Sequence, residues 1–298
     1  MSTSTGKAEP GPLRKPPKES GKLWTISPVV VWMSLLFLLP LLLVLIVSFF
    51  SRSIFGGIQL PLTIDNYIRF FDPLYGQILW VSVYFSFVTT VICLLIGYPF
   101  AYIVARSPNR YRNLLLMLII VPFWTNSLIR TYAWIVLLRT EGVINTMLLQ
   151  LGLTDQPLTL LYNELAVMIG LVYTMLPFMI LPLYASIEKL DKAYLEAAAD
   201  LGAKPWTAFW KVTIPLTTPG IIAGSLLVFI PSLGLFFIPD LMGGSKAVLI
   251  GNLIKNQFLT ARDWPFGSAV SIILMGLTLL CIFLYMRITK DKEGKGLL

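Results

Sequence analysis

The sequence contains no histidine and only two cysteines. Without histidine, the chain lacks the side chain that most often acts as a general acid or base near neutral pH and that most often binds transition metals. Cys93 and Cys281 both lie inside apolar runs, and no CxxC pair occurs, so neither a disulfide nor a zinc site is expected. We therefore assign no catalytic residue and no metal ligand.

A phosphate-binding loop is also missing from the chain. The pattern GxxxxGK[ST], whose backbone cradles the phosphates of ATP, occurs nowhere in the sequence. The segment GGSK at 243–246 lacks the required spacing. The chain is therefore not expected to bind ATP by this device, and we assign it no cofactor and no enzymatic activity.

Charged residues are scarce, whereas apolar residues are abundant. Only 13% of the residues are charged, 56% are hydrophobic and the mean hydropathy is +0.78. A soluble domain of 298 residues could not hide so much apolar surface, so we predict an all-α integral membrane protein. The net charge of +8 does not indicate nucleic-acid binding, because the basic residues lie between hydrophobic runs and form no stripe.

Six apolar runs are long enough to cross a bilayer, which takes about 20 residues of helix. All but the third lack formal charges, and the third contains only Arg130. We predict one transmembrane domain over 28–287, between a disordered cytoplasmic N-tail at 1–27 and a C-tail at 288–298. The six predicted transmembrane helices cover residues 29–50, 78–105, 114–138, 165–187, 220–239 and 267–286.

The distribution of lysine and arginine predicts the orientation of these helices. Sixteen of the 23 basic residues fall in the N-tail, the loops at 106–113 and 188–219, and the C-tail, whereas six fall in the loops on the other side. Because basic residues concentrate in cytoplasmic loops, both termini and the 188–219 loop are expected to be cytoplasmic.

The loop at 188–219 reads as two short helices, of which Asp191 can cap the first. Gly202 is expected to end this first helix, because glycine tolerates the left-handed conformation found at helix C-termini. Small and apolar residues four apart would form one face of the first helix: Ala193, Ala197 and Leu201.

The second helix of this loop is expected to start at Pro205, which suits a first helical turn, and to end before Pro215. The two helices would meet at a bend and expose apolar side chains, which then need a partner groove or the membrane surface. The aromatic residues of the second helix are Trp206, Phe209 and Trp210.

The same loop resembles the EAA loop of ABC importer permeases. Glu-Ala-Ala at 196–198, Gly202 and Pro215 match the family pattern, and Val212 and Ile214 are conservative departures from it. The resemblance implies a type I importer fold and a loop that docks on a separate ATPase; the alternative is a surface hairpin without a partner. The coupling residues that it implies are Glu196, Ala197, Ala198, Gly202, Trp206, Phe209 and Pro215.

Three long segments, 122–152, 176–203 and 243–269, resemble the spermidine/putrescine permeases of the PotB type. This resemblance implies a bacterial inner membrane location and polyamine transport. It also implies several partners: a second, PotC-like permease chain, two PotA-like ATPase subunits that bind ATP and magnesium, a periplasmic PotD-like polyamine-binding protein, and membrane lipid.

A cation that crosses a bilayer needs carboxylates, carbonyls or aromatic faces in place of water. The polar and aromatic residues of the spans could instead form an interfacial belt, bridge helices or lie solvated at the mouth of the bundle. A buried Arg130 would repel a polyamine unless it pairs with a carboxylate or extends toward the membrane surface. The candidates for the substrate pathway are Trp124, Asn126, Ser127, Arg130, Tyr132, Tyr173, Ser232, Phe236 and Asp240.

Two other kinds of transporter remain as alternatives. A permease for another small solute, of the iron(III), thiamine or sulfate type, would fit Arg130 better if the solute were an anion. A secondary transporter driven by an ion gradient would need carboxylates at mid-depth of the membrane, and the predicted spans contain none.

The three loops on the other side contain amphipathic stretches at 62–71, 143–151 and 249–258. We interpret them as interfacial helices that cap the bundle. They could also form a docking platform for an external protein that delivers the substrate.

Overall fold

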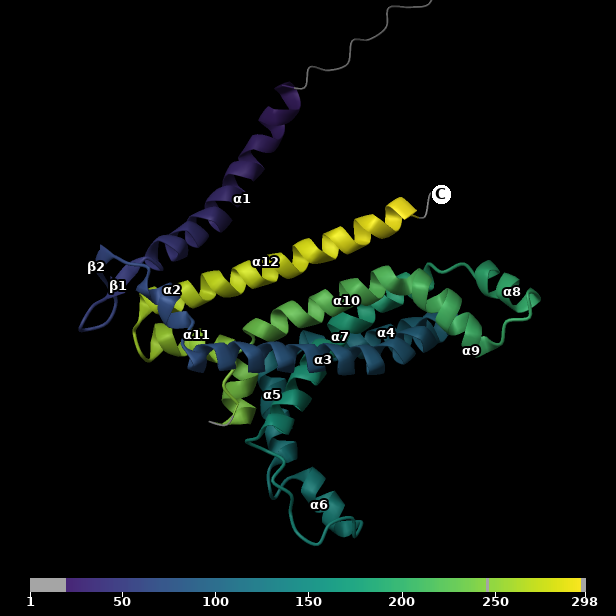
Figure 1. The fold of residues 1–298 in the computed structure, drawn as a ribbon. Helices are drawn as coiled ribbons and strands as arrows, with labels where there is room; N and C mark the ends of the chain where they lie inside the picture. The colour runs from purple at the N-terminus through teal and green to yellow at the C-terminus, as the bar shows by residue number, and fades with distance from the viewer. Residues whose placement is uncertain (1–19, 245–246, 296–298) are drawn as a thin grey trace, which may run out of the picture. The chain divides into compact units, whose positions relative to one another are not determined.

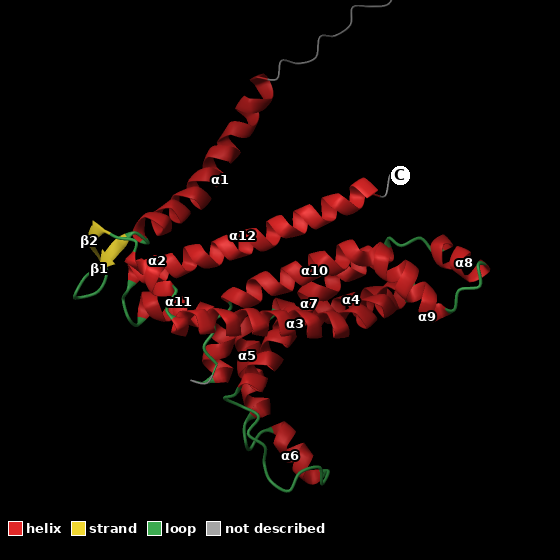
Figure 2. Ribbon diagram, viewed as in Figure 1, coloured by secondary structure: helices red, strands yellow, loops and turns green. Residues whose placement is uncertain are grey.

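The computed structural model describes residues 20–244 and 247–295 and is helical over most of this length (Figures 1 and 2). The chain divides into two compact units, Met1–Ile46 and Val47–Leu298. The elements are α1 (Ser20–Val47), β1 (Phe50–Arg52), β2 (Ile58–Leu62), α2 (Asp65–Phe70), α3 (Pro73–Arg106), α4 (Asn109–Trp124), α5 (Ser127–Leu138), α6 (Val143–Gln150), α7 (Glu164–Glu188), α8 (Ala193–Asp200), α9 (Pro205–Ala208), the π-helical turn η1 (Phe209–Thr213), α10 (Ile214–Gly234), the π-helical turn η2 (Pro239–Gly243), α11 (Ile250–Leu259) and α12 (Trp264–Lys295).

The first unit contributes the helix α1, which begins at Ser20 inside the predicted N-tail. Residues 1–19 of that tail lie outside the described part of the chain. From Ile26 onward the helix is strongly apolar, and large side chains such as Trp32 and Phe37 are exposed all around it. A helix that is apolar on every side requires lipid or another protein around it.

The second unit is built around three long helices, α3, α7 and α10, which pack along one another (Figure 1). Glycines lie where these helices touch: a Cβ on Gly97 would approach Met179 to 3.2 Å, and one on Gly224 would approach the sulfur of Met179 to 2.8 Å. Small residues at such contacts let helix backbones come close, which strengthens packing in a membrane where lipid is as apolar as leucine.

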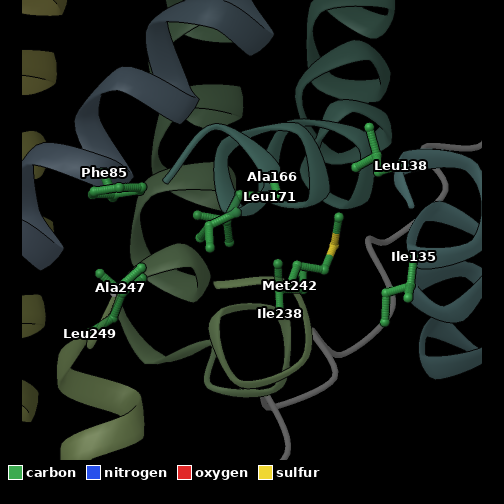
Figure 3. Close-up of a cluster of buried hydrophobic side chains, with 10 residues drawn as sticks. Phe85, Ile135, Leu138, Ala166, Leu171, Ile238, Met242, Ala247 and Leu249 are labelled. Atoms are coloured by element: carbon green, nitrogen blue, oxygen red, sulfur yellow. The ribbon is translucent and has the colours of Figure 1, made fainter. Parts of the chain in front are cut away.

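A cluster of buried side chains joins α5 and α7 to the turn η2 (Figure 3). Leu171 faces Ile238 and Met242 across this cluster, and all three side chains are fully buried. Ile135 and Leu138 attach α5 to the same cluster. This packing fixes the short helix α5 on the bundle.

Five described helices are long and apolar enough to cross a membrane, and a bent pair would make a sixth. They confirm the predicted spans except the third. Residues 114–138 do not form one straight helix, because α4 ends at Trp124 and the chain bends by 93° before continuing through α5 and α6. Asn126 caps the new helix: its Oδ1 accepts a hydrogen bond from the N–H of Leu128, 2.8 Å away.

The amphipathic stretches of the longer loops form short helices, as predicted, in α2, α6 and α11. A small antiparallel hairpin of β1 and β2, which the sequence analysis did not predict, precedes α2. Asn66 of α2 holds the first strand, because its Nδ2 donates to the carbonyl oxygens of Ser48 and Phe50 at 2.9 and 2.8 Å.

An ion pair ties α2 to the start of α12. Arg69 bonds to Asp263 at 2.8 Å, and Asp263, which is only 1% exposed, also accepts a hydrogen bond from the N–H of Phe266. Burial alone would lower the pKa of Arg69, but its hydrogen bonds to Asp263 and Tyr75 outweigh this effect and raise the pKa. The guanidinium also lies 4.2 Å from the ring centre of Phe266. The two helices are therefore held together by charge and by stacking.

The contact between α7 and α10 can be tested at Gly220. A Cβ on this residue would lie 2.4 Å from the Cβ of Ser186 and 2.9 Å from the carbonyl oxygen of Pro182. We expect Gly220→Ala to lower the free energy of unfolding by about 1–3 kcal/mol, measured as a lower melting temperature in detergent. Gly276→Ala in α12 is the control, because no atom lies within 4 Å of its new Cβ. Equal melting temperatures of the two variants would contradict the close contact.

Candidate functional site

The hairpin at 188–219 lies at one end of the bundle, whereas α11 and α2 lie at the other (Figure 1). Its first helix, α8, is shaped as predicted. Asp191 accepts a hydrogen bond from the N–H of Ala193 at 3.0 Å, and Gly202 ends the helix in the left-handed conformation with φ +79°. The N–H of Ala203 then bonds to the carbonyl oxygen of Ala198 at 2.9 Å, which satisfies the end of the helix.

The prediction that Pro215 ends the second helix is wrong. Helix α9 passes through η1 directly into α10, so that residues 205–234 form one continuous apolar span. In the π-helical turn the N–H of Ile214 bonds to the carbonyl oxygen of Phe209, five residues earlier. This wider turn leads into the first turn of α10, where the missing N–H of Pro215 is tolerated.

The predicted apolar face of α8 is exposed, as expected for a bend that presents apolar side chains outward. Ala193 and Ala197 are exposed, as is Glu196, and the side chain of Leu201 is 89% exposed. The inner side uses other residues, and among them Leu195 lines a cavity of about 230 Å³ together with Tyr102 of α3, Ala199, Ala203, Pro205, Ala208, Phe209 and Thr213. Both faces of α8 carry small residues, so residue spacing alone could not decide which face packs inward.

Three aromatic residues follow the bend of the hairpin. Phe209 points inward and packs edge-on against Tyr98 and Tyr102 of α3, with ring centres 5.7 and 6.3 Å apart. Trp206 and Trp210 pack against Phe209 but remain 71% and 53% exposed. The hairpin is thus anchored to α3 by one ring and presents two indoles outward.

The base of the hairpin contains features that the sequence analysis did not identify. Arg112 of α4 forms an ion pair with Glu188 of α7 at 2.8 Å. Beside it, a groove of about 680 Å³ opens between the end of α7 and the start of α10. Residues of both helices and of the hairpin line this groove, among them Ser186, Lys189, Asp191, Tyr194, Leu216 and Gly220.

The break between α4 and α5 brings together two of the predicted pathway residues. The guanidinium carbon of Arg130 lies 5.8 Å from the ring centre of Tyr173 and 5.6 Å from that of Phe123. Arg130 and Tyr173 also line a cavity of about 210 Å³. Among the described residues no carboxylate pairs with Arg130.

The other pathway candidates are not gathered at this cavity. Asp240 bonds to Asn252 and Lys255, and the hydroxyl of the buried Ser232 donates to the carbonyl oxygen of Val228 in its own helix at 2.7 Å. Asn126 caps α5, and Ser127 accepts a hydrogen bond from Thr131 through its carbonyl oxygen. The remaining candidates are exposed on the surface of the bundle: Trp124, Tyr132 and Phe236.

Phe123 was not among the predicted candidates, although it stands directly beside Trp124. An aromatic residue in the turn before a helix break could have indicated it. Within the described part of the chain, no group of three or more acidic or cysteine side chains could hold a metal ion.

The family of the chain follows from comparison with known proteins. Residues 97–291 match the family model of the binding-protein-dependent transport system inner membrane component. The chain belongs to this family of ABC importer permeases. It is therefore a multi-pass inner membrane protein and a transport subunit rather than an enzyme.

Two relatives place this permease among the PotB type. It is 52% identical over 266 residues to the spermidine/putrescine transport system permease protein PotB of Haemophilus influenzae, covering 89% of this chain and 93% of that protein. It is 51% identical over 270 residues to PotB of Escherichia coli K12, covering 90% of this chain and 98% of that protein.

A solved structure confirms the fold of this permease. A chain of a bacterial alginate ABC transporter, crystallised in complex with an alginate-bound periplasmic protein, superposes with a TM-score of 0.73. The match covers 92% of this chain and 96% of that chain at 18% sequence identity. The permease therefore has the type I importer fold that its EAA-like loop indicated.

The break at residue 126 depends on its cap, which can be tested. We expect Asn126→Ala to lower the free energy of unfolding by about 1 kcal/mol, because the N–H of Leu128 loses its acceptor. Asn126→Asp keeps the acceptor and should melt with the wild type in a thermal denaturation assay. If both variants melted alike, the cap would not stabilise the break.

Proposed function

We propose that this permease moves polyamines, spermidine or putrescine, across the inner membrane as one side of an ATP-driven pore. The observation that carries the proposal is its identity of 51–52% to proteins named as spermidine/putrescine permeases, over nearly their whole length. The match covers 93% and 98% of those two proteins.

The permease would work with three kinds of partner. A PotC-like chain would supply the other side of the pore, two PotA-like ATPases would bind ATP and magnesium, and a periplasmic PotD-like protein would deliver the polyamine. The domain assignment belongs to the same proposal: residues 28–287 form the permease domain, with cytoplasmic tails at 1–27 and 288–298. The helical ends of α1 and α12 extend into both tails.

The orientation of the proposed pore follows from charge. Sixteen of the 23 basic residues lie on the side of the termini and of the hairpin, which supports a cytoplasmic hairpin within reach of the ATPases. The exposed surface of the hairpin is apolar and aromatic and includes Leu201, Trp206 and Trp210. Such a surface fits a groove of a partner protein better than water.

The proposed docking and coupling residues all lie on this hairpin. Glu196, Ala197 and Trp206 are exposed, so they would touch the ATPase. Gly202 permits the bend that presents them, and Phe209 anchors the hairpin to α3. Ala198 is half-buried and Pro215 lies inside the continuous span, so both would act on the shape of the hairpin rather than by contact.

One observation favours a second candidate, a permease for an anionic solute such as sulfate. Arg130 lines a cavity without a carboxylate partner among the described residues, and a free guanidinium attracts anions. The identity to PotB proteins outweighs this single residue.

Substrate competition tests the proposal directly. Vesicles that contain the assembled transporter and its binding protein should take up labelled spermidine when ATP is supplied to the ATPases. Excess unlabelled spermidine or putrescine should suppress this uptake by at least about tenfold, whereas excess sulfate should have no effect. Uptake that sulfate suppresses and spermidine does not would favour the second candidate.

Coupling through the hairpin can be tested at Gly202. Its φ of +79° is costly for a β-branched residue, by about 1–2 kcal/mol, although no atom lies within 4 Å of an added Cβ. We expect Gly202→Val to insert normally, to keep ATP hydrolysis by the ATPases, and to lose most spermidine uptake. Gly202→Asn is the control, because asparagine tolerates this conformation, and it should retain uptake. Normal uptake by the valine variant would argue against the role of the bend.

A further inference from the structure

Arg130 occupies a place that is built to receive a cation. Its guanidinium carbon lies within 6 Å of two aromatic ring centres, those of Phe123 and Tyr173, which is the range of cation–π attraction. Phe123 comes from the last turn of α4 and Tyr173 from the middle of α7, so the helix break assembles the two rings. Trp134 packs edge-on against Tyr173 at 5.4 Å and supports its position.

A cavity beside the rings is lined by Arg130 and Tyr173 but not by Phe123, and it is otherwise apolar. Its volume is about 210 Å³, and apart from Arg130 and Tyr173 its lining consists of Ile96, Phe100, Leu118, Ile119, Pro122, Leu176, Pro177 and Ile180. No carboxylate lines it, and the buried Nε of Arg130 has no hydrogen-bond acceptor among the described residues. Aromatic faces are therefore the main attraction that the described residues offer to the guanidinium.

This arrangement matches the chemistry of a polyamine as well as that of arginine. A polyamine carries ammonium groups separated by methylene stems, and the Arg130 side chain is a cationic head on a methylene stem. The rings could hold either cation, but two positive charges in one apolar cavity would repel each other strongly. Because of this repulsion, the rings can hold only one cation at a time.

We propose that the rings of Phe123 and Tyr173 form an organic-cation site, which the guanidinium of Arg130 occupies in the substrate-free permease and leaves when an ammonium group of the substrate enters. This inference rests on the proposed polyamine function. It adds a cation site and gives Arg130 the role of a placeholder, that is, an internal cation which the substrate displaces.

Arg130 lies in the first turn of α5, next to the connection to α4 through Thr125 and Asn126, whereas Ile135 and Leu138 hold the later part of α5 in the buried cluster. A movement at the break would carry the guanidinium away from the rings.

The cation site itself can be tested without any polyamine. In the assembled transporter, Arg130→Ala should melt at a lower temperature than the wild type, and millimolar methylguanidinium should restore part of the loss by refilling the cavity. Arg139→Ala, which removes an exposed positive charge at the far end of α5, should show no such response. Absence of a methylguanidinium response in Arg130→Ala would overturn the proposed site.

The placeholder role is tested by spermidine binding to the transporter in phosphatidylcholine nanodiscs without the binding protein. Arg130→Gln should bind spermidine about three- to tenfold more tightly than the wild type, because the rings no longer have an internal cation to release. Arg139→Gln should bind like the wild type, and the double variant Arg130→Gln, Tyr173→Leu should lose the gain. Unchanged or weaker binding by Arg130→Gln would overturn the placeholder.

The experiments distinguish a failure of the polyamine function from a failure of the cation site. A wild-type transporter that neither binds nor takes up spermidine would refute the polyamine function and, with it, the exchange of Arg130 for substrate. The methylguanidinium experiment would still decide whether the aromatic cavity holds a cation.

Discussion

A chain that crosses hydrocarbon must satisfy its backbone N–H and C=O groups within the protein, and most irregular features of this fold answer that requirement. Where α4 stops, the side chain of Asn126 takes over as the acceptor for the first turn of α5. Where Pro215 removes an N–H, a π-helical turn precedes it and keeps the helix continuous. Where α8 ends, Gly202 lets the chain fold back onto its own carbonyls. Each departure from a straight helix is therefore satisfied locally.

The same requirement explains how far the fold could be predicted from the sequence. Five spans and the short amphipathic helices follow from hydropathy and residue spacing, which report what each segment buries. The break in the third span does not, because the run from 114 to 138 is apolar enough to read as one span despite Asn126 and Arg130, and the second helix starts at the cap that Asn126 provides. Hydropathy measures the preference for lipid and contains no information about helix direction. The hairpin of β1 and β2 was also missed, although Gly56 and Gly57, both with positive φ, lie in its turn; Asn66 of the following helix holds its first strand.

The two parts of the candidate site, the hairpin at 188–219 and the surroundings of Arg130, could be predicted from the sequence to different degrees. The ends of α8 follow from Asp191 and Gly202, because capping and left-handed glycine are local properties of the chain. The inward face of α8 and the partners of Arg130 depend on which helices lie nearby, and only the folded chain decides that. Asp240 is an example. It was predicted as a substrate-pathway residue, but it pairs with Lys255, 15 residues away, and so joins η2 to α11.

Because the span from Pro205 to Gly234 is continuous, the hairpin is connected to the bundle by helix. A helix break at Pro215 would have removed this connection. A short helix hinged at the membrane surface could move without disturbing the bundle. Here α9, η1 and α10 form one continuous helix that changes direction between α9 and α10 (Figure 1). Helix α10 packs on both α3 and α7 through contacts with almost no free space, such as that between Gly220 and Ser186. At the end away from the hairpin, α10 leads toward the cluster of Leu171, Ile238 and Met242 that also holds α5. Because packed interiors transmit displacement instead of absorbing it, a push on the exposed indoles of the hairpin would reach the helices that surround Arg130.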